Sequence, residues 1–365
     1  APPPAPTPVA GPFLLRRWEL TLEHSYGPWP LDSILGLGQE WLRRLGLEDL
    51  EPSRVVFLDT ETTGLAGGTG TYAFLIGLGW LEPERVVVEQ LMLRDFAEEA
   101  ALLDYLARRL ARCGGLVSFN GKSFDVQLLQ TRFVMKRVRF GLEEVPHLDL
   151  LHPCRRVWGA CFDDCRLQTL EEKLLGVQRS GDVPGWLIPR LFFNFLRSRN
   201  LRPLERVLDH NKRDVLALMG LVGALRHCLE QPRQPRSALE DFALGRWLEE
   251  LGLEEVGWEL IERAVCSSLP PQLLRAGRLR LAARRRRSGD RDGAADLWSE
   301  ILGEHPGDPE ASEELAKYFE HQQRDFPAAL RLVDSVLRRR DLTRGCRRRF
   351  EDRRLRLLRR LDETG

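Results

Sequence analysis

The feature that most constrains this chain is a short apolar run that ends in two acids and a glycine turn. Four apolar residues, Val55–Leu58, lead directly into Asp59 and Glu61, and Gly64 follows. Side chains at positions i and i+2 of a β-strand point to the same face, so both carboxylates would emerge side by side near the strand end. Carboxylates held that close repel each other unless a cation lies between them, and hard oxygen ligands favour Mg²⁺ or Mn²⁺. The alternative is a surface hairpin whose acids face solvent.

The composition is typical of a globular protein with two domains. The 365 residues suffice for two apolar cores of ordinary size. The 55 basic and 54 acidic residues nearly cancel, so the net charge does not indicate a partner. Seven cysteines without a short disulfide pattern favour a reducing compartment. The first residues do not resemble a signal peptide and no apolar run is long enough to cross a bilayer, so we expect a cytoplasmic protein without a membrane partner.

Composition and periodicity divide the chain into five segments. They are a Pro/Ala-rich tail expected to be disordered (1–12), a lead-in packed on the next domain (13–53), an α/β domain (54–230), a linker with two prolines (231–236) and an all-α domain with a basic C-terminal helix (237–365). Strands are expected at 18–22, 55–58, 73–81, 85–93 and 116–119. Helices are expected at 39–45, 97–112, 123–136, 148–158, 167–175, 188–198 and 203–229. This order predicts an α/β fold whose mixed sheet is flanked by helices.

The all-α domain contains a repeat of about 34 residues. Leu281-Ala282 recurs as Leu315-Ala316, and Ala294-Ala295 recurs as Ala328-Ala329 at the same offset. Small residues at this period indicate a tetratricopeptide-like solenoid. The last stretch, residues 338–360, is rich in arginine and predicts a basic helix. Such a helix either caps the domain with a solvated face or contacts nucleic acid.

Three further residues could join the acid pair. Asp125 follows an expected strand and a turn at Gly121, which places its carboxylate near a strand end, where α/β sheets bind ligands. His210 and Asp214 stand at i and i+4 on the long helix, so they share one face. Taken alone, Asp125 is more readily a helix-start acid, and the His–Asp pair is more often a surface contact.

Together the acids form a more specific pattern. Asp59, Glu61, Asp125 and Asp214 are four carboxylates on separate elements that could hold two divalent ions about 3.5–4 Å apart. Such a pair activates a water and stabilises the leaving 3′ oxygen of a phosphodiester. His210, with an ordinary pKa of about 6.5, can take the water's proton at neutral pH.

These motifs resemble the DEDD exonuclease superfamily. They are Asp-x-Glu-Thr-Thr-Gly from Asp59, Phe-Asn-Gly-x-x-Phe-Asp ending at Asp125, and His-x-x-x-Asp from His210. The domain order is similar to the YprB-like branch, in which a ribonuclease H-like domain precedes tetratricopeptide-like helices. The resemblance implies a metal-dependent 3′→5′ exonuclease with two Mg²⁺ or Mn²⁺ ions. It also implies DNA rather than RNA as substrate, a role in repair, and a helicase or another repair protein bound by the helical domain.

The resemblance also implies roles for single residues. It makes Asp59, Glu61, Asp125 and Asp214 the metal ligands and His210 the general base. Substrate contacts are suggested in the two turns beside them, at Thr62, Gly64, Leu65 and Asn120. Turn geometry accounts for each of these four equally well. One spacing departs from the pattern. The histidine subclass of this superfamily commonly has four residues between its His and Asp, whereas the tyrosine subclass has three between its Tyr and Asp. Here three residues separate His210 from Asp214, which is the tyrosine-type spacing.

Two other functions stay open from the sequence. One is a nucleic-acid- or protein-binding scaffold whose nuclease site no longer turns over, and the other is a structure-specific endonuclease. Asp149 resembles a recurrent acid of the family, but we do not expect it to bind metal. Asn120–Ser123 imitates a Walker A loop without its first glycine, and the cysteines near His152 lack a CxxC pair. No motif decides between DNA and RNA, single and double strand, or Mg²⁺ and Mn²⁺.

Overall fold

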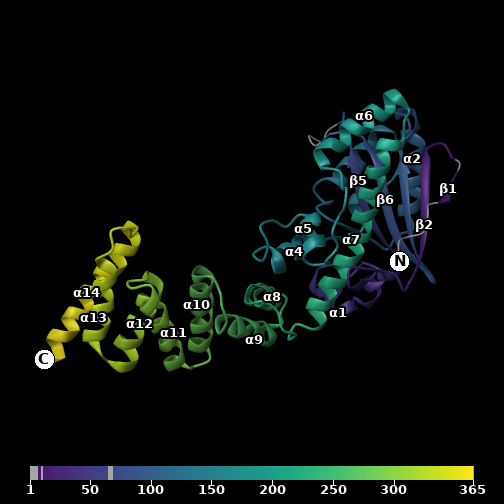
Figure 1. The fold of residues 1–365 in the computed structure, drawn as a ribbon. Helices are drawn as coiled ribbons and strands as arrows, with labels where there is room; N and C mark the ends of the chain where they lie inside the picture. The colour runs from purple at the N-terminus through teal and green to yellow at the C-terminus, as the bar shows by residue number, and fades with distance from the viewer. Residues whose placement is uncertain (1–6, 10, 65–68, 365) are drawn as a thin grey trace. The chain divides into compact units, whose positions relative to one another are not determined.

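The computed structural model describes residues 7–9, 11–64 and 69–364. The chain forms two units that divide between Gln234 and Pro235, inside the expected linker (Figure 1). The first unit contains a mixed sheet flanked by helices, as predicted, and the second is a run of helices. Within the described ranges, every helix is too short or too polar to span a membrane.

The main sheet of the first unit has seven strands in the order β1-β2-β7-β6-β5-β8-β9. They are β1 (Thr7–Val9), β2 (Leu14–Thr21), β5 (Val55–Thr62), β6 (Ala73–Glu82), β7 (Arg85–Met92), β8 (Gly115–Ser118) and β9 (His147–Asp149). From β1 to β5 the neighbours pair antiparallel, whereas β8 is parallel to both β5 and β9. The carboxyl ends of β5 and β8 therefore lie at the same edge. A separate ribbon pairs β3 (Ser25–Tyr26) with β4 (Trp29–Pro30).

Helices of the first unit alternate with short turns. The α-helices are α1 (Gln39–Arg44), α2 (Glu99–Leu110), α3 (Asp125–Met135), α4 (Leu151–Trp158), α5 (Leu167–Lys173), α6 (Ile188–Ser198) and α7 (Glu205–Glu230). The 3₁₀ turns are η1 (Ser33–Gly36), η2 (Pro52–Arg54), η3 (Phe96–Glu98), η4 (Leu142–Glu144), η5 (Gly185–Leu187) and η6 (Arg202–Leu204). These helices agree with the predicted ones to within a few residues, with one exception at the start of α4.

Two segments differ from the sequence prediction. Leu148 was expected to begin a helix, but His147–Asp149 form β9, and α4 starts only at Leu151. Three residues are too few to show a strand or helix period, and here β8 offers a parallel edge for pairing. Thr7–Val9 lie in the tail that was expected to be disordered, yet they pair with β2 as β1. The remaining tail residues, 1–6 and 10, lie outside the described ranges.

Helix α7 crosses the sheet and packs on β5 and β6 (Figure 1). Two glycines of β6 permit this close approach. A Cβ atom at Gly77 would lie 2.5 Å from Asn211 Oδ1, and one at Gly79 would lie 2.5 Å from Met219 Cε. Any larger residue would push α7 away from the sheet. The glycines therefore bring Asn211, and with it the rest of this helix turn, to the end of β5.

The second unit consists of consecutive helices that pack on one another. They are α8 (Ala238–Glu250), α9 (Glu254–Val265), α10 (Pro271–Arg287), α11 (Arg291–Glu304), α12 (Pro309–Tyr318) with a π-helical turn η7 (Phe319–Gln323), α13 (Phe326–Leu337) and α14 (Arg344–Thr364). The repeated alanines are buried in two apolar clusters, Ala282 and Ala294 in one and Ala316 and Ala329 in the next. The 34-residue period thus matches the helix pairs α10–α11 and α12–α13. The tetratricopeptide likeness itself stays a prediction.

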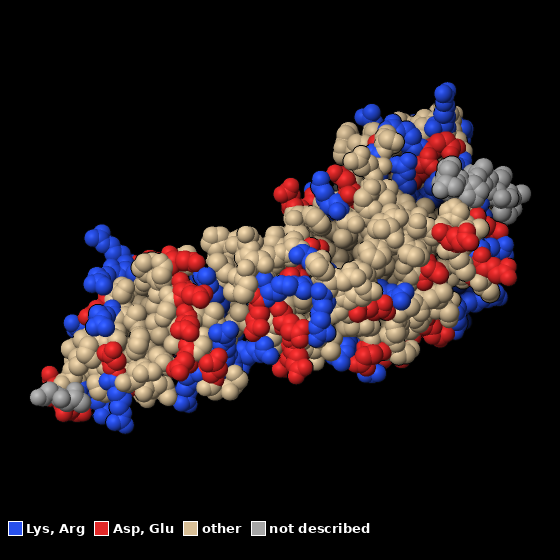
Figure 2. All heavy atoms as spheres, turned by 60° about the horizontal axis from the view of Figure 1, so that its bottom comes forward, with Lys and Arg blue, Asp and Glu red and all other residues tan. Residues whose placement is uncertain are grey.

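Helix α14 is the basic helix that the sequence predicts. Phe350 and Leu357 bury its apolar side in the last cluster of the unit. Arg353 and Arg356 both pair with Glu320, and on the face in Figure 2 acidic side chains lie between the basic ones of this unit. These contacts dock the helix on the unit, as a capping helix would be, and the contact with nucleic acid stays a prediction.

Candidate metal centre

The acid pair lies in the second half of β5, as the strand pattern predicts. Val55–Leu58 are buried, whereas Asp59 and Glu61 are half-buried. Asn211 donates from Nδ2 to Asp59 Oδ2 at 2.8 Å and to the Asp59 carbonyl oxygen at 3.3 Å. Gln90 Nε2 in turn donates to Asn211 Oδ1 at 2.9 Å, which fixes the amide's orientation. Two buried amides therefore hold the Asp59 carboxylate in place.

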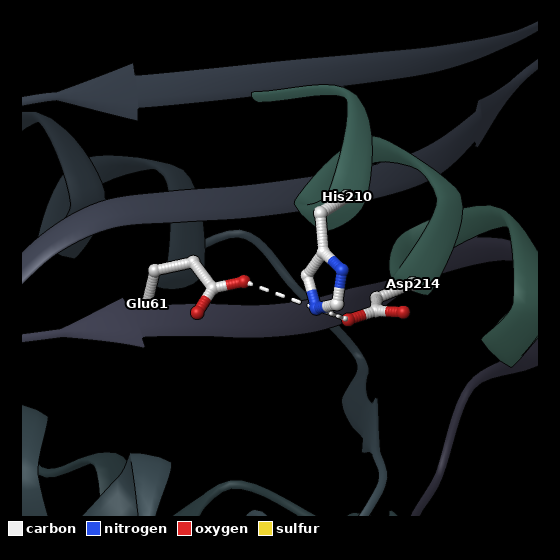
Figure 3. Close-up of side chains that lie close together, drawn as sticks. All are labelled: Glu61, His210 and Asp214. Atoms are coloured by element: carbon white, nitrogen blue, oxygen red, sulfur yellow. Dashed lines mark ion pairs between the residues drawn. The ribbon is translucent and has the colours of Figure 1, made fainter. Parts of the chain in front are cut away.

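Glu61, His210 and Asp214 form a compact group of three (Figure 3). One ligand atom from each lies within 4.8 Å of the others. His210 Nε2 is 3.3 Å from Asp214 Oδ2 and 3.6 Å from Glu61 Oε1. The i, i+4 spacing on α7 thus places imidazole and carboxylate together, although it is the spacing of the tyrosine subclass. This arrangement offers nitrogen and oxygen ligands to one cation.

Asp125 lies beside this group rather than in it. It is the first residue of α3, and its Oδ1 accepts a hydrogen bond from Thr60 Oγ1. The turn before it is held by Asp149, which accepts from the backbone N–H of Asn120 at 2.7 Å and of Lys122 at 3.1 Å. Asp149 therefore positions the turn that carries Asp125.

Three of the four suggested substrate contacts lie within the described residues, at the end of β5 and in the turns after β5 and β8. Thr62 Oγ1 donates to the Gly64 carbonyl oxygen at 2.9 Å and so closes the turn after β5. Asn120 has a positive φ of 64°, a conformation that asparagine tolerates better than most residues. Turn geometry thus accounts for Thr62 and Asn120, and their substrate roles stay predictions. Leu65 lies outside the described residues.

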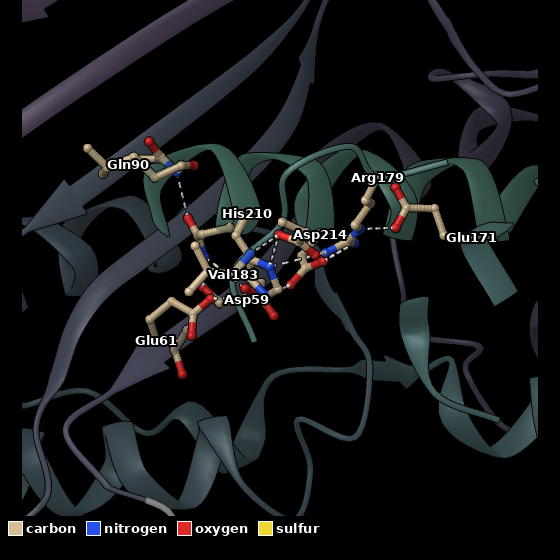
Figure 4. Close-up of polar contacts among 12 residues, drawn as sticks. Asp59, Glu61, Gln90, Glu171, Arg179, Val183, His210 and Asp214 are labelled. Carbon is tan, nitrogen blue, oxygen red and sulfur yellow. Dashed lines mark hydrogen bonds and ion pairs between the residues drawn. The ribbon is translucent and has the colours of Figure 1, made fainter. Parts of the chain in front are cut away.

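The sequence analysis missed two residues of this site, Arg179 and Asp182, of which Figure 4 labels Arg179. The Arg179 side chain is buried and donates to Glu171 and Asp214 through short contacts and to Asp182 Oδ2 at 3.2 Å. Its Nη1 also lies 3.3 Å from His210 Nδ1. Both residues stand in an irregular segment between α5 and η5, where no periodic pattern could have indicated them.

Asp182 determines how His210 presents its ring. Asp182 Oδ1 lies 2.7 Å from His210 Nδ1 and also accepts from the Val183 N–H at 2.9 Å. A carboxylate at this distance fixes the proton of the neutral imidazole on Nδ1. Nε2 then faces the carboxylates of Glu61 and Asp214. We assign the Nδ1 proton from the contact with Asp182.

Comparison with known proteins agrees with this architecture. Residues 56–226 match the RNase H superfamily, which covers the chain from β5 to most of α7. Over 333 residues the chain is 31% identical to the uncharacterized protein YprB of Bacillus subtilis (strain 168), a match that spans 89% of this chain and 80% of that protein. The chain belongs to the YprB family. In this YprB-family protein an RNase H superfamily domain therefore precedes the helical unit.

Three acids of the YprB-family site, Asp59, Glu61 and Asp125, have pKa values above those of ordinary carboxyl groups. Burial raises the pKa of Asp59 well above its usual value, and the charges of Asp214, Glu61 and Asp125 raise it further. Burial and neighbouring acids raise the pKa of Glu61 in the same way. Burial also raises the pKa of Asp125 to about 6, although the hydrogen bond from Thr60 opposes this. Without a cation, these three acids therefore keep their protons to a higher pH than ordinary carboxyl groups do.

This electrostatic pattern fits a divalent metal. The donor set is rich in carboxylate oxygens, which hard cations such as Mg²⁺ and Mn²⁺ prefer. Arg179 balances part of the negative charge, because it pairs with Asp214 as well as with Glu171 and Asp182. The RNase H superfamily assignment points the same way, because RNase H-like nucleases use divalent metals. Metal ions would bind through Asp59, Glu61, Asp125 and Asp214, as the sequence predicts.

We expect divalent metal to stabilise the protein more at pH 7.5 than at pH 5. A carboxyl whose pKa is raised on folding binds its proton more tightly in the folded state. The metal-free protein therefore loses stability as pH rises from about 4, the pKa of an unfolded acid, through the folded value of about 6 for Asp125. Mn²⁺ must displace more protons from these acids at pH 5 than at pH 7.5. Thermal unfolding with Mn²⁺ or EDTA at both pH values measures this, and an equal gain at both would contradict it.

Proposed function

We propose that this YprB-family protein is a metal-dependent 3′→5′ exonuclease that hydrolyses phosphodiester bonds, with DNA favoured and a role in repair. The observation that carries the proposal is the meeting of Glu61, His210 and Asp214 at the end of β5, with Asp59 beside them. Membership of the RNase H superfamily supports a nucleic-acid-cleaving function in general. The 3′→5′ direction rests on the likeness of the three motifs to DEDD exonucleases.

Each residue has a defined task in this proposal. Asp59, Glu61, Asp125 and Asp214 would hold two divalent ions, which supply charge stabilisation at the phosphate and lower the pKa of a water. His210 accepts a proton on Nε2, because Nδ1 is occupied by Asp182. The helical unit is the proposed binding surface for a helicase or another repair protein.

A degradation assay tests the proposal. Single-stranded, duplex and 3′-overhang DNA and matching RNA, each with a 5′ label, are incubated with Mg²⁺, Mn²⁺ or EDTA. We expect a metal-dependent ladder that shortens from the 3′ end and releases nucleoside monophosphates. A circular single strand is the matched control, because it has no end and should stay intact. Cleavage of the circle would instead support the endonuclease, and strand binding without any cleavage would support the scaffold.

Replacement of Asp182 by Ala should lower kcat about 10–100-fold with little change in KM. The loss would arise because His210 Nδ1 no longer has a carboxylate that fixes its proton and ring orientation. Asp182→Asn should lose less activity, since its amide oxygen can still accept from Nδ1. Steady-state rates on a labelled single strand measure both variants. Asp209→Asn, an exposed acid next to His210 in the sequence, serves as control, and an unchanged rate in Asp182→Ala would disprove the positioning role.

A further inference from the structure

Two of the exposed aromatic side chains stand close in sequence to residues of the acid cluster. In the described part of the chain, the large aromatic residues with exposed side chains are Phe124, Trp186 and Phe193. Phe124 directly precedes Asp125, and Trp186 follows Asp182 by four residues. Trp186 is 72% exposed and Phe193 is 40% exposed, which is costly for side chains of this size unless a partner covers them. Phe124 and Trp186 therefore stand close in sequence to residues of the site, and Phe193 follows on α6.

Trp186 and Phe193 share one hollow with two arginines. The hollow has a volume of about 660 Å³ and lies over η5 and the outer side of α6. Arg190, Phe193 and Arg197 line it from consecutive turns of the helix, and Trp186 closes it at the helix start. We call the surface formed by Trp186, Arg190, Phe193 and Arg197 the α6 face.

The arginines of the α6 face have no carboxylate partner. Within the described residues, Arg190 makes no ion pair or hydrogen bond, and Arg197 donates only to the Phe193 carbonyl oxygen and to Asn194 Oδ1 on its own helix. Many other arginines pair with an acid, as Arg16 does with Glu205 at 2.6 Å. The α6 face therefore keeps two positive charges available for an anionic ligand.

The α6 face is connected to the acid cluster by a short segment. At one end Asp182 contacts His210, and Val183 lies close to the cluster in Figure 4. At the other end Phe192, on the buried side of α6, stacks on Phe74 with ring centroids 4.0 Å apart. Phe74 begins β6, next to the end of β5. The segment therefore passes the end of β5, and four residues of chain cover no more than about 14 Å.

We propose that the α6 face binds the unpaired strand of a single-stranded nucleic acid whose 3′ end occupies the acid cluster. Flat aromatic side chains stack on bases, and arginines between them contact the phosphates, which is how sequence-tolerant single-strand sites are built. A duplex cannot use this face, because its bases are already stacked on each other. The proposal rests on the proposed function for the position of the 3′ end. It adds that the substrate is single-stranded or carries a 3′ overhang.

Equilibrium binding of labelled oligonucleotides in EDTA tests the α6 face without turnover. The probes are a 12-nucleotide deoxythymidine strand, a 12-nucleotide uridine strand and a blunt DNA duplex of the same length. In the full chain, the double variant Trp186→Ala/Phe193→Ala should bind both single strands at least about 10-fold more weakly, with duplex binding unchanged. Trp186→Phe should retain most of the affinity. Arg190→Glu should weaken binding and reduce its salt dependence.

Leu355→Ala is the matched control, because Leu355 is an apolar side chain of α14 that is 55% exposed. Thermal unfolding of each variant checks that the fold is retained. Unchanged affinity of the double variant for single strands, or no binding of single strands by the wild-type protein, would overturn the proposal. Equal losses with deoxythymidine and uridine strands would support stacking without recognition of the sugar.

Cleavage kinetics separate this proposal from the proposed function. In the double variant, KM for a 12-nucleotide strand should rise about 10-fold while KM for a dinucleotide stays the same, because a dinucleotide cannot reach the α6 face. Binding losses without any cleavage by the wild-type protein would support the α6 face and refute the exonuclease. Cleavage with an unchanged KM for the long strand would refute the α6 face and leave the exonuclease intact.

Discussion

Replacement of Asp59 by Asn should lower the rate of hydrolysis by about 10²–10³-fold and at the same time stabilise the metal-free protein. The rate falls because one carboxylate of the proposed metal centre is lost. Stability rises because burial and the charges of Asp214, Glu61 and Asp125 all disfavour an ionised Asp59. The Asn211 amide can still donate to the carbonyl oxygen of the new side chain. A gain of about 1–2 kcal/mol in the free energy of unfolding is expected at pH 7.5 in EDTA.

Urea unfolding in EDTA and in Mn²⁺, together with rates on a labelled strand, measures both effects. In Mn²⁺ the gain should vanish or reverse, because the wild-type acids are then paired with the cation. The control is Asp209→Asn, which removes an exposed acid of α7 that pairs only with Lys212 among the described residues. That variant should keep its rate and its stability. An Asp59→Asn protein that is less stable in EDTA would show that the acids do not repel one another as we infer.

Replacement of Arg179 by Ala should destabilise the protein by about 3–5 kcal/mol. The guanidinium is buried and contacts three acids, Glu171, Asp182 and Asp214. Its removal leaves these carboxylates buried without their cation, which is the costly way to break an ion pair. Arg179→Lys should recover only part of the loss, because an ammonium cannot reproduce the fork of hydrogen bonds. The loss should be larger in EDTA than in Mn²⁺, since the metal would replace part of the missing charge near Asp214.

A second variant makes the cause of this destabilisation clear. Glu171→Gln in the Arg179→Ala background should restore about 1–2 kcal/mol, because one uncompensated charge is removed. Arg43→Ala is the control for loss of an arginine, because it breaks a solvent-exposed pair with Glu40 and should change stability little. If Arg179→Ala were no less stable than Arg43→Ala in chemical unfolding, Arg179 would not hold the acids together.

The parts of this protein that follow local rules could be predicted from the sequence. Val55–Leu58 are apolar in succession because they form a central strand with both faces covered, and this pattern places Asp59 and Glu61 near the strand end. His210 and Asp214 meet because four residues make about one helical turn. In each case the information is contained in a few neighbouring residues.

The parts that depend on distant contacts could not be predicted. Arg179 and Asp182 lie in a segment without periodic pattern, and their positions are fixed by Glu171 and by α7. The strand β9 was mistaken for helix because His147–Asp149 are too few to show a period, and only the edge of β8 selects a strand. Asn211 gave no signal either, because its role arises from the glycine at position 77 that lets α7 approach the sheet.

The most direct test of the metal centre is a crystal structure of the protein with Mn²⁺, in which anomalous scattering locates each metal ion. We expect two peaks about 3.5–4 Å apart at the end of β5, with Asp59, Glu61, Asp125 and Asp214 as their protein ligands. His210 should stay bound to Asp182 through Nδ1 and keep Nε2 free for a water. The absence of any peak among these acids at millimolar Mn²⁺, or a single ion bound by groups elsewhere, would contradict the account.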